Sequence, residues 1–212
     1  MGDDGRVTTS RRDSAKRRAE LVEAAERALL RSGLSALTVR AVASEAGVSP
    51  GSVLYHYANT DDLVYELHRT LVDRYVAARL RAVARVADPA ERLVRAVRSG
   101  LPSGPDDASC RLLYELHGLA ARSRVHAALM ASLWDREVML YEGIVQAGVE
   151  SGAFTVRREP HELAQALLAM EDGLGLHIVS HNSSVGVDLA ERLLTAFAAE
   201  QLCCELPELT GR

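Results

Sequence analysis

The sequence of 212 residues has few cysteines, few aromatic residues and a single lysine, Lys16. Its three cysteines are Cys110 and the adjacent pair Cys203 and Cys204. Adjacent cysteines rarely bond to each other, so these residues exclude a disulfide framework and favour a reducing compartment. The sequence also lacks an apolar run of the ~20 residues that span a membrane, and its polar N-terminus lacks the pattern of a signal peptide. These absences predict a cytoplasmic protein with no membrane partner.

The rest of the composition favours helices. Hydrophobic residues account for 48% of the chain and charged residues for 25%, as in a protein with a packed core. Alanine and leucine, two strong helix formers, are abundant, and neither internal repeats nor convincing strands are visible. The sequence therefore predicts an all-α protein.

The formal net charge of −4 is unevenly distributed along the chain. Residues 1–60 contain nine basic and seven acidic residues, whereas residues 61–212 contain 16 basic and 22 acidic residues. A basic N-terminal part followed by an acidic remainder is consistent with a protein that binds nucleic acid at one end. Because the basic excess is small, we expect non-specific DNA binding to be weak and sensitive to salt.

Residues 37–63 contain the pattern of a helix-turn-helix. Thr38 is suited to cap a first short helix, in which apolar residues recur at helical spacing over residues 39–46. Gly47 can adopt the left-handed conformation that ends this helix. Ser49, which is followed by proline, is suited to cap a second short helix. In a helix-turn-helix this second helix lies in the major groove of DNA.

The side chains of the second short helix favour DNA binding. Small residues at its start are followed by Tyr55, His56 and Tyr57. Two short helices around a glycine turn also occur in proteins that never bind DNA, but a purely structural helix rarely exposes three such residues together. A helix that reads the groove needs small residues near the bases and hydrogen-bonding groups near the phosphates.

Residues 14–66 resemble the DNA-binding domain of the TetR family of bacterial transcriptional regulators. The resemblance rests on G-L-x-x-L-T-V-R-A-V-A at residues 33–43 and on E-A-G-V-S-P-G-S-V at residues 45–53. The chain departs from the family pattern at Leu54 and Thr60, where the family usually has a tyrosine and a lysine that contact the DNA backbone. We therefore expect fewer phosphate contacts than is usual in the family.

The helix-turn-helix pattern assigns candidate DNA contacts. The guanidinium of Arg40, at the start of the first short helix, matches the O6 and N7 acceptors of guanine, so we expect it to contact a base. The other candidates are residues that read or border the groove, namely Ser49, Gly51, Ser52 and Tyr55, and residues that position the DNA backbone, namely Thr38, His56, Tyr57 and Thr60.

The chain divides into three predicted segments: a disordered arm at 1–13, a helix-turn-helix domain at 14–60 and a helical effector-binding and dimerisation domain at 61–212. In the arm, Arg11 and Arg12 are interpreted as solvated residues, with insertion into a minor groove as the alternative. The apolar periodicity predicts helices at 14–32, 60–87, 91–99, 109–122, 124–150, 160–181 and 187–203. The helix that starts near Thr60 joins both domains, so it can carry a signal between them.

The resemblance implies that an effector binds among the helices of the second domain. The candidates are large or amphipathic residues on otherwise alanine- and leucine-rich helices: Tyr114, His117, Trp134, Tyr141, Met170 and His177. For each of them an ordinary core or interface role is the alternative. Glu171 and Asp172 are candidates to meet a cationic effector, but such acids more often face solvent, so the effector's charge stays open. Residues 169–174 are also similar to regulators of the choline-responsive branch, a likeness that fixes no effector.

The last two predicted helices carry more apolar surface than a single helical layer easily buries. The resemblance implies that they form a four-helix interface in a homodimer. The candidate interface residues are Leu163, Leu167, Leu174, Ile178, Leu189, Leu193 and Phe197.

These observations predict a ligand-responsive, homodimeric transcriptional regulator. We expect a repressor that a small-molecule effector releases from a palindromic operator in double-stranded DNA. No catalytic constellation is visible, so we expect neither an enzyme nor a cofactor nor a metal. Two alternatives stay open. One is a helical sensor that uses a metal at His177 and His181 or a thiol at Cys203 and Cys204, and the other is a ligand-independent architectural DNA binder.

Overall fold

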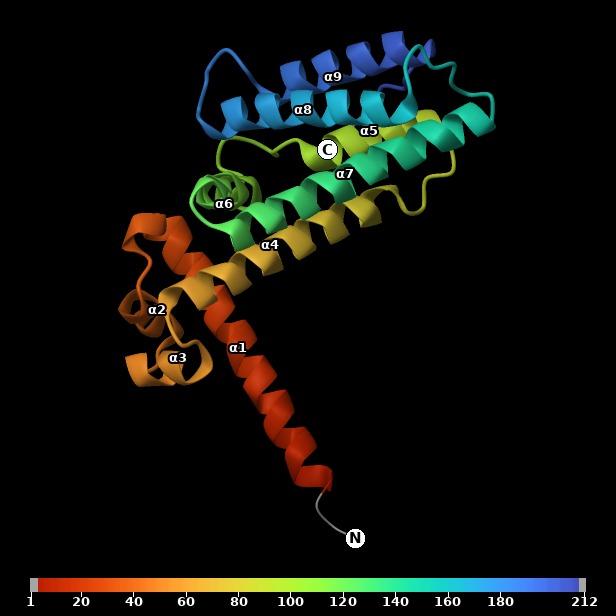
Figure 1. Ribbon diagram of the computed structural model, residues 1–212. Helices are drawn as coiled ribbons and strands as arrows, with labels where there is room; N and C mark the ends of the chain where they lie inside the picture. Colours follow the sequence, from red (N-terminus) through yellow and green to blue (C-terminus); the bar gives the residue numbers. More distant parts are fainter. Residues whose placement is uncertain (1–3, 210–212) are drawn as a thin grey trace.

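The computed structural model describes residues 4–209, which form α-helices and two short 3-10 helices without any strand (Figure 1). The all-α prediction is confirmed. In chain order the α-helices are α1 (Asp4–Ser32), α2 (Val39–Ala46), α3 (Pro50–His56), α4 (Thr60–Val83), α5 (Pro89–Gly100), α6 (Ala108–His117), α7 (Arg124–Glu150), α8 (Pro160–Val179) and α9 (Val187–Leu202). Over the same residues, no helix is both long enough and apolar enough to cross a membrane.

Helices α1, α2 and α3 pack with the first turns of α4 into an N-terminal head, at the lower left of Figure 1. Its core consists of apolar residues that recur at helical spacing, and Leu21, Val42, Val53 and Leu63 are completely buried there. Helix α4 continues without a break from the head into the rest of the molecule. The head and the body therefore share one rigid element.

The predicted caps build the turn of the helix-turn-helix. The hydroxyl of Thr38 accepts a hydrogen bond from the backbone N–H of Ala41, and the hydroxyl of Ser49 accepts one from the N–H of Ser52, both at 3.2 Å. Gly47 has a φ of 66° and a ψ of 33°, the left-handed conformation in which a β-carbon causes strain. Local sequence signals are therefore sufficient to place α2 and α3.

Helix α1 begins at Asp4 rather than near Ser14, so the prediction of a disordered arm is wrong for residues 4–13. No proline interrupts this segment, and a helix that is already anchored by packing extends at little cost per residue. The side chain of Arg11 lies outside the described residues, whereas that of Arg12 is exposed.

The remaining helices form a layered body above the head in Figure 1. Helices α4 and α7 lie side by side, and α5 and α6 pack against them. Helices α8 and α9 form an outer layer, in which α8 packs directly on α7. A second hydrophobic core joins these layers and includes Leu93, Ile144, Leu167 and Leu194.

Some helix ends differ from the predicted ones. Helix α4 is capped by Asn59, whose side-chain oxygen accepts from the N–H of Asp62 at 2.8 Å, and it ends at Val83, four residues before the predicted end. The predicted helix at 109–122 ends as an α-helix at His117 and continues as a 3-10 helix over Gly118–Ala121. Element boundaries depend on such caps, which are weaker signals than apolar periodicity.

Candidate DNA-binding surface and effector cavity

The exposed faces of α2 and α3 carry most of the predicted DNA contacts. Arg40 is exposed on α2, and Tyr55 is 84% exposed on α3 next to Leu54, which is 48% exposed. The other candidates that are exposed or half-buried are Thr38, Ser49, Gly51, Ser52, His56 and Thr60. A helix that reads the groove needs this exposure, and the individual contacts stay predictions.

Tyr57 does not belong to this surface, because it is only 2% exposed. It follows the last residue of α3 in an extended conformation that turns its ring toward α1. Its hydroxyl donates to the backbone carbonyl of Arg18 at 3.3 Å, and the guanidinium of Arg18 lies 4.4 Å from the ring centroid. Burial raises the pKa of the Tyr57 hydroxyl. The prediction that Tyr57 contacts the DNA backbone is therefore wrong, since the residue belongs to the core of the head.

Ion pairs divide the basic residues of the head into two groups. Arg27 and Arg31 of α1 lie 2.9 Å and 2.5 Å from the carboxylate of Glu45 on α2. Their hydrogen bonds lower the pKa of Glu45, and they attach α2 to α1. Arg40 has no ion-pair partner among the described residues, so its guanidinium is available to an external acceptor.

A cavity of about 80 Å³ lies in the body between α4, α6, α7 and α8. It combines aromatic and apolar walls with two carboxyl groups, and its lining residues are Tyr75, Cys110, Leu113, Tyr114, His117, Met130, Leu133, Trp134, Glu137 and Asp172. Larger hollows between α5 and α9 and along α4 and α7 are open surface grooves. Mostly apolar walls with a few polar groups are typical of a site for a small molecule.

Half of the predicted effector-binding residues line this cavity: Tyr114, His117 and Trp134. Tyr141 is completely buried beside it. Met170 packs against the second hydrophobic core, and His177 is exposed, with its Nδ1 3.2 Å from the amide nitrogen of Asn182. Met170 and His177, which were also predicted to bind the effector, are therefore not among the residues that line this cavity. Helix α8 presents a different face to the cavity, the one that carries Asp172.

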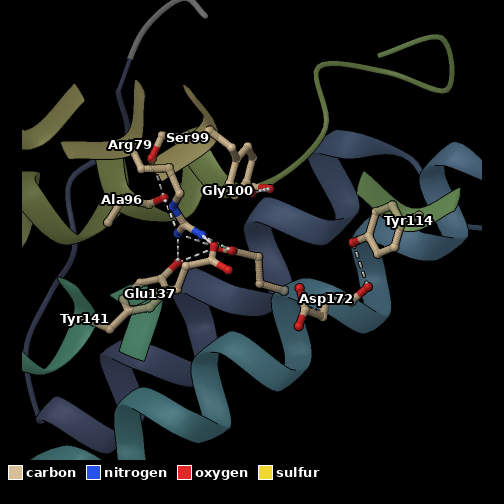
Figure 2. A network of polar contacts seen from close by, with 10 residues as sticks. Arg79, Ala96, Ser99, Gly100, Tyr114, Glu137, Tyr141 and Asp172 are labelled. Carbon is tan, nitrogen blue, oxygen red and sulfur yellow. Dashed lines mark hydrogen bonds and ion pairs between the residues drawn. The ribbon is translucent and has the colours of Figure 1, made fainter. Parts of the chain in front are cut away.

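Next to the cavity, a buried cluster of charged residues surrounds Arg79 of α4, which is 1% exposed (Figure 2). Nη1 of Arg79 donates to Oε1 of Glu137 and, at 2.5 Å, to Oε1 of Glu171. Nη2 donates to Oε2 of Glu171 at 3.0 Å, and to the Tyr141 hydroxyl and the Ala96 carbonyl at 3.2 Å each. The hydroxyl of Tyr141 in turn donates to Glu171. The cluster joins α4, α5, α7 and α8.

Sequence reasoning missed Arg79 and Glu137. Each interrupts an apolar stripe: Arg79 lies three residues after Val76 and four before Val83, and Glu137 is four residues from both Leu133 and Tyr141. A charged residue within the buried stripe of an amphipathic helix is itself a signal of a buried ion pair.

Burial raises the pKa values of the carboxyl groups at the cavity. Loss of hydration raises the pKa of Glu137 to about 8. Desolvation, together with the charge of Glu171, raises the pKa of Asp172 to about 6. Burial also raises the pKa of Glu171, while Arg79 opposes this change. Glu137 and Glu171 therefore share one permanently charged guanidinium, whereas Asp172 makes no ion pair with it.

Hydrogen bonds and a glycine fix the aromatic walls of the cavity. The Tyr75 hydroxyl donates to the backbone carbonyl of Gly100 at 2.9 Å, and the Tyr114 hydroxyl donates to the backbone carbonyl of Asp172 at 3.0 Å (Figure 2). A β-carbon at Gly100 would overlap the carboxyl of Glu171. The absence of a side chain at Gly100 therefore lets α5 pack closely against the charged cluster.

Known family profiles match both parts of the chain. Residues 21–67 match the profile of bacterial regulatory proteins of the tetR family. Residues 89–202, more than half of the chain, match the profile of the C-terminal domain of BetI-type transcriptional repressors. The chain belongs to the TetR family.

Similar proteins agree with membership of the TetR family. The HTH-type transcriptional regulator PksA of Bacillus subtilis is 26% identical over 91% of this chain and 93% of its own length. The nicotine-responsive transcriptional repressor HdnoR of Paenarthrobacter nicotinovorans is 26% identical over 85% of this chain and 93% of its own length. A protein of Saccharomonospora viridis, assigned as a transcriptional regulator and solved in complex with choline, has a TM-score of 0.80 and 26% identity over 88% of this chain and 96% of that chain. This TetR-family chain is thus a DNA-binding transcriptional regulator, and the prediction that it is not an enzyme is confirmed.

The predicted dimer residues of this TetR-family chain divide between the interior and the outer face of α8 and α9. Three are buried within the subunit, so the prediction that they form a dimer interface is wrong: Leu163, Leu167 and Ile178. They lie on the face of α8 that packs on α7. The others are half-buried or exposed, namely Leu174, Leu189, Phe197 and Leu193, the last being 44% exposed. Leu176, which was not among the predicted interface residues, is 48% exposed.

A buried histidine pair lies where the head of this TetR-family chain meets the body. Nδ1 of His68 on α4 is 2.8 Å from Nδ1 of His126 on α7, and the rings stack with centroids 5.1 Å apart. One nitrogen must donate while the other accepts, so at least one of the two rings is neutral and carries its proton on Nε2. Desolvation lowers the pKa of both residues, and the neighbouring charge of His126 helps to bring that of His68 to about 4.

The residues proposed for a metal or thiol sensor are not grouped. Across residues 4–209, no three or more His, Cys, Asp or Glu side chains are arranged to hold a metal ion. Helix α8 ends at Val179, so His181 leaves the helix with a φ of 56° and no longer shares a helical face with His177. Cys203 is exposed, and its Sγ accepts from Nε of Arg157 at 3.3 Å.

Proposed function

We propose that this protein is a homodimeric repressor in the cytoplasm that leaves a palindromic operator when a small molecule enters the cavity beside Arg79. The observation that carries this proposal is the position of the cavity. Its wall includes Tyr75 of α4, and α4 begins in the DNA-binding head. A ligand that displaces α4 would therefore change the separation of the two heads. A dimer that binds successive major grooves needs that separation to be about 34 Å.

The lining of the cavity supports a small organic cation as the effector. Glu137 and Asp172 contribute carboxyl groups, while Tyr75, Tyr114 and Trp134 contribute aromatic rings. Carboxylates and aromatic faces together are the surroundings that protein sites offer to ammonium groups. Two relatives agree with this class, since one was solved with choline and another is nicotine-responsive. Since its volume of about 80 Å³ is below the ~300–1,000 Å³ of typical ligand pockets, the walls of the cavity must move apart when an effector enters.

The dimer is supported by the outer face of α8 and α9. Leu176 and Leu193 are each more than two-fifths exposed there, and Leu189 and Phe197 are half-buried, whereas Leu174 packs toward the second hydrophobic core. Two copies that join these faces would bury the apolar residues in a four-helix interface. Such a dimer presents two α3 helices to DNA, so we expect an operator with two related half-sites.

The experiment that tests this function has two stages. Purified protein is first used to select bound duplexes from a random DNA pool at about 150 mM salt. A palindrome with half-sites one helical turn apart supports the dimeric regulator, and no enrichment contradicts it. Choline and nicotine are then titrated into the protein–operator complex. Release of the operator supports the proposed response, whereas unchanged binding in the presence of a ligand shown to occupy the cavity refutes it.

A further inference from the structure

The carboxyl group of Glu137 lies at the border between the cavity and the charged cluster. It lines the cavity and also accepts from Nη1 of Arg79. The titratable or charged groups around it come from every neighbouring element: Arg79 and Tyr75 on α4, Cys110, Tyr114 and His117 on α6, Tyr141 on α7, and Glu171 and Asp172 on α8. Arg79 is the only permanently positive group in this set.

The two carboxyl groups that share Arg79 are unequal partners. Glu171 accepts from both Nη1 and Nη2 of Arg79 and also from the Tyr141 hydroxyl. Glu137 accepts only from Nη1. A guanidinium stabilises best the carboxylate that it holds through two nitrogens. Glu171 is therefore the ionised partner of Arg79. If Glu137 were also ionised, its carboxylate would lack a separate cation.

A second ionised carboxylate at this place would be unfavourable in the empty cavity. Glu137 is 5% exposed, and Glu171 is 2% exposed. An uncompensated buried charge costs several kcal/mol, which a protein avoids by keeping the group protonated. The raised pKa of Glu137, at about 8, agrees with this geometry.

We propose that the empty cavity holds a proton on Glu137 and exchanges it for the positive charge of the effector, so that Glu137 selects a cation over an uncharged molecule of the same shape. This inference rests on the proposed function only in taking a small organic cation as the ligand. On binding, the O–H bond of Glu137 breaks, its proton goes to solvent, and the carboxylate pairs with the ammonium group. The total charge within the cavity does not change.

The exchange predicts how the affinity for the effector depends on pH. Below the pKa of Glu137 the ligand must displace a proton, so its affinity falls by about tenfold for each pH unit. Above this pKa the carboxylate is already ionised, and the affinity reaches a plateau. An uncharged isostere displaces no proton, so its affinity is independent of pH. Asp172, with a pKa raised to about 6, contributes only at the acidic end of this range.

The test compares choline with its uncharged isostere, 3,3-dimethylbutan-1-ol, by isothermal titration calorimetry. Titrations near pH 7 in two buffers of different ionisation enthalpy give the number of protons released. We expect choline to release close to one proton and to bind about tenfold more tightly for each unit between about pH 6 and about pH 8. The alcohol should release none and bind with a constant, weaker affinity.

Substitutions assign the proton to its residue. Glu137→Gln keeps the shape of a protonated carboxyl group, and we expect it to abolish proton release and reduce choline affinity to that of the alcohol. Glu150→Gln, an exposed residue near the end of the same helix, should behave as the unsubstituted protein. The imidazole of His117 also lines the cavity, so His117→Gln is included and should retain proton release. Circular dichroism checks that each variant is folded.

Several results would overturn the exchange. These are choline binding without proton release, proton release that persists in Glu137→Gln, and no binding of choline or tetramethylammonium near pH 8.5. Operator binding is measured separately by fluorescence anisotropy. Choline that releases a proton but leaves the operator bound would refute the proposed function and keep the exchange. Operator release without proton release would support the proposed function and refute the exchange.

Discussion

Arg79 of α4 and Glu171 of α8 are joined by two hydrogen bonds, although neither residue is more than 2% exposed. Nη1 of Arg79 lies 2.5 Å from Oε1 of Glu171, and Nη2 lies 3.0 Å from Oε2. This pair links the helix that begins in the DNA-binding head to a helix of the outer layer. A ligand that altered the charge beside the pair would therefore act on both helices at once.

Removing the cation of this pair should strongly destabilise the protein. Arg79→Leu leaves the buried carboxyl of Glu171 without a cation, so we expect the free energy of unfolding in urea to fall by about 3–5 kcal/mol. The double substitution Arg79→Leu with Glu171→Leu should recover part of that loss. Arg95→Leu removes an exposed pair with Glu91 and should change stability by less than about 1 kcal/mol. Equal effects of Arg79→Leu and Arg95→Leu would show that the buried pair has no special role.

A methyl group at Gly100 should disturb the same cluster. Gly100→Ala places a β-carbon against the Glu171 carboxyl, and we expect a loss of about 1–3 kcal/mol in the free energy of unfolding. Gly104→Ala is the matched control, because no atom lies within 4 Å of a β-carbon at that position. The thermal midpoints of both variants give the comparison. A Gly100→Ala protein as stable as the control would mean that α5 and Glu171 separate easily.

Arg40 should contribute to operator recognition. Arg40→Ala is expected to weaken operator binding by about 1–3 kcal/mol and to relax base preference at one position of each half-site. Arg95→Ala, on an exposed surface of the body, serves as the control. Fluorescence anisotropy with the selected operator and its single-base variants measures both quantities. Full affinity and an unchanged base preference in Arg40→Ala would remove this residue from the recognition surface.

The buried histidine pair should make stability depend on pH. The folded-state pKa of His68, about 4, is below the ordinary value, so the unfolded chain binds more protons between these values. Stability is therefore lost as the pH falls, by about 2 kcal/mol at pH 5 for this residue alone. The raised pKa of Glu137 has the opposite effect on stability. The measurement is therefore the difference in the free energy of unfolding between the unsubstituted protein and His68→Gln. If this difference, measured by urea unfolding, did not change with pH, the lowered pKa of His68 would be contradicted.

The outer face of α9 should hold the dimer together. Leu193→Glu places a charge on this face, and we expect sedimentation to show monomers and operator affinity to fall because only one head binds at a time. Leu80→Glu on α4 is the matched control, since Leu80 is 50% exposed outside the proposed interface. A dimer that survives Leu193→Glu but dissociates in Leu80→Glu would move the interface to the groove along α4 and α7.

Local chemistry explains why the head could be predicted well from the sequence. The caps at Thr38 and Ser49 and the left-handed conformation of Gly47 are each fixed by the residue and its close neighbours. The same rules failed at Tyr57, because exposure depends on where α1 lies rather than on the sequence of α3. The start of α1 was also missed, because a segment without strong signals takes the conformation of the helix to which it is attached.

The sequence by itself determined that the chain is helical, that residues 37–63 form a helix-turn-helix and that the last two helices carry excess apolar surface. Only the tertiary structure decided which face of α8 is interior, because a helix that is apolar on more than one side fits either orientation. It also decided that Arg79, Glu137 and Glu171 meet, since these residues are separated by 34 to 92 positions and lie on three helices. Periodicity describes one helix at a time, whereas a cavity and its charge balance depend on how several helices pack together.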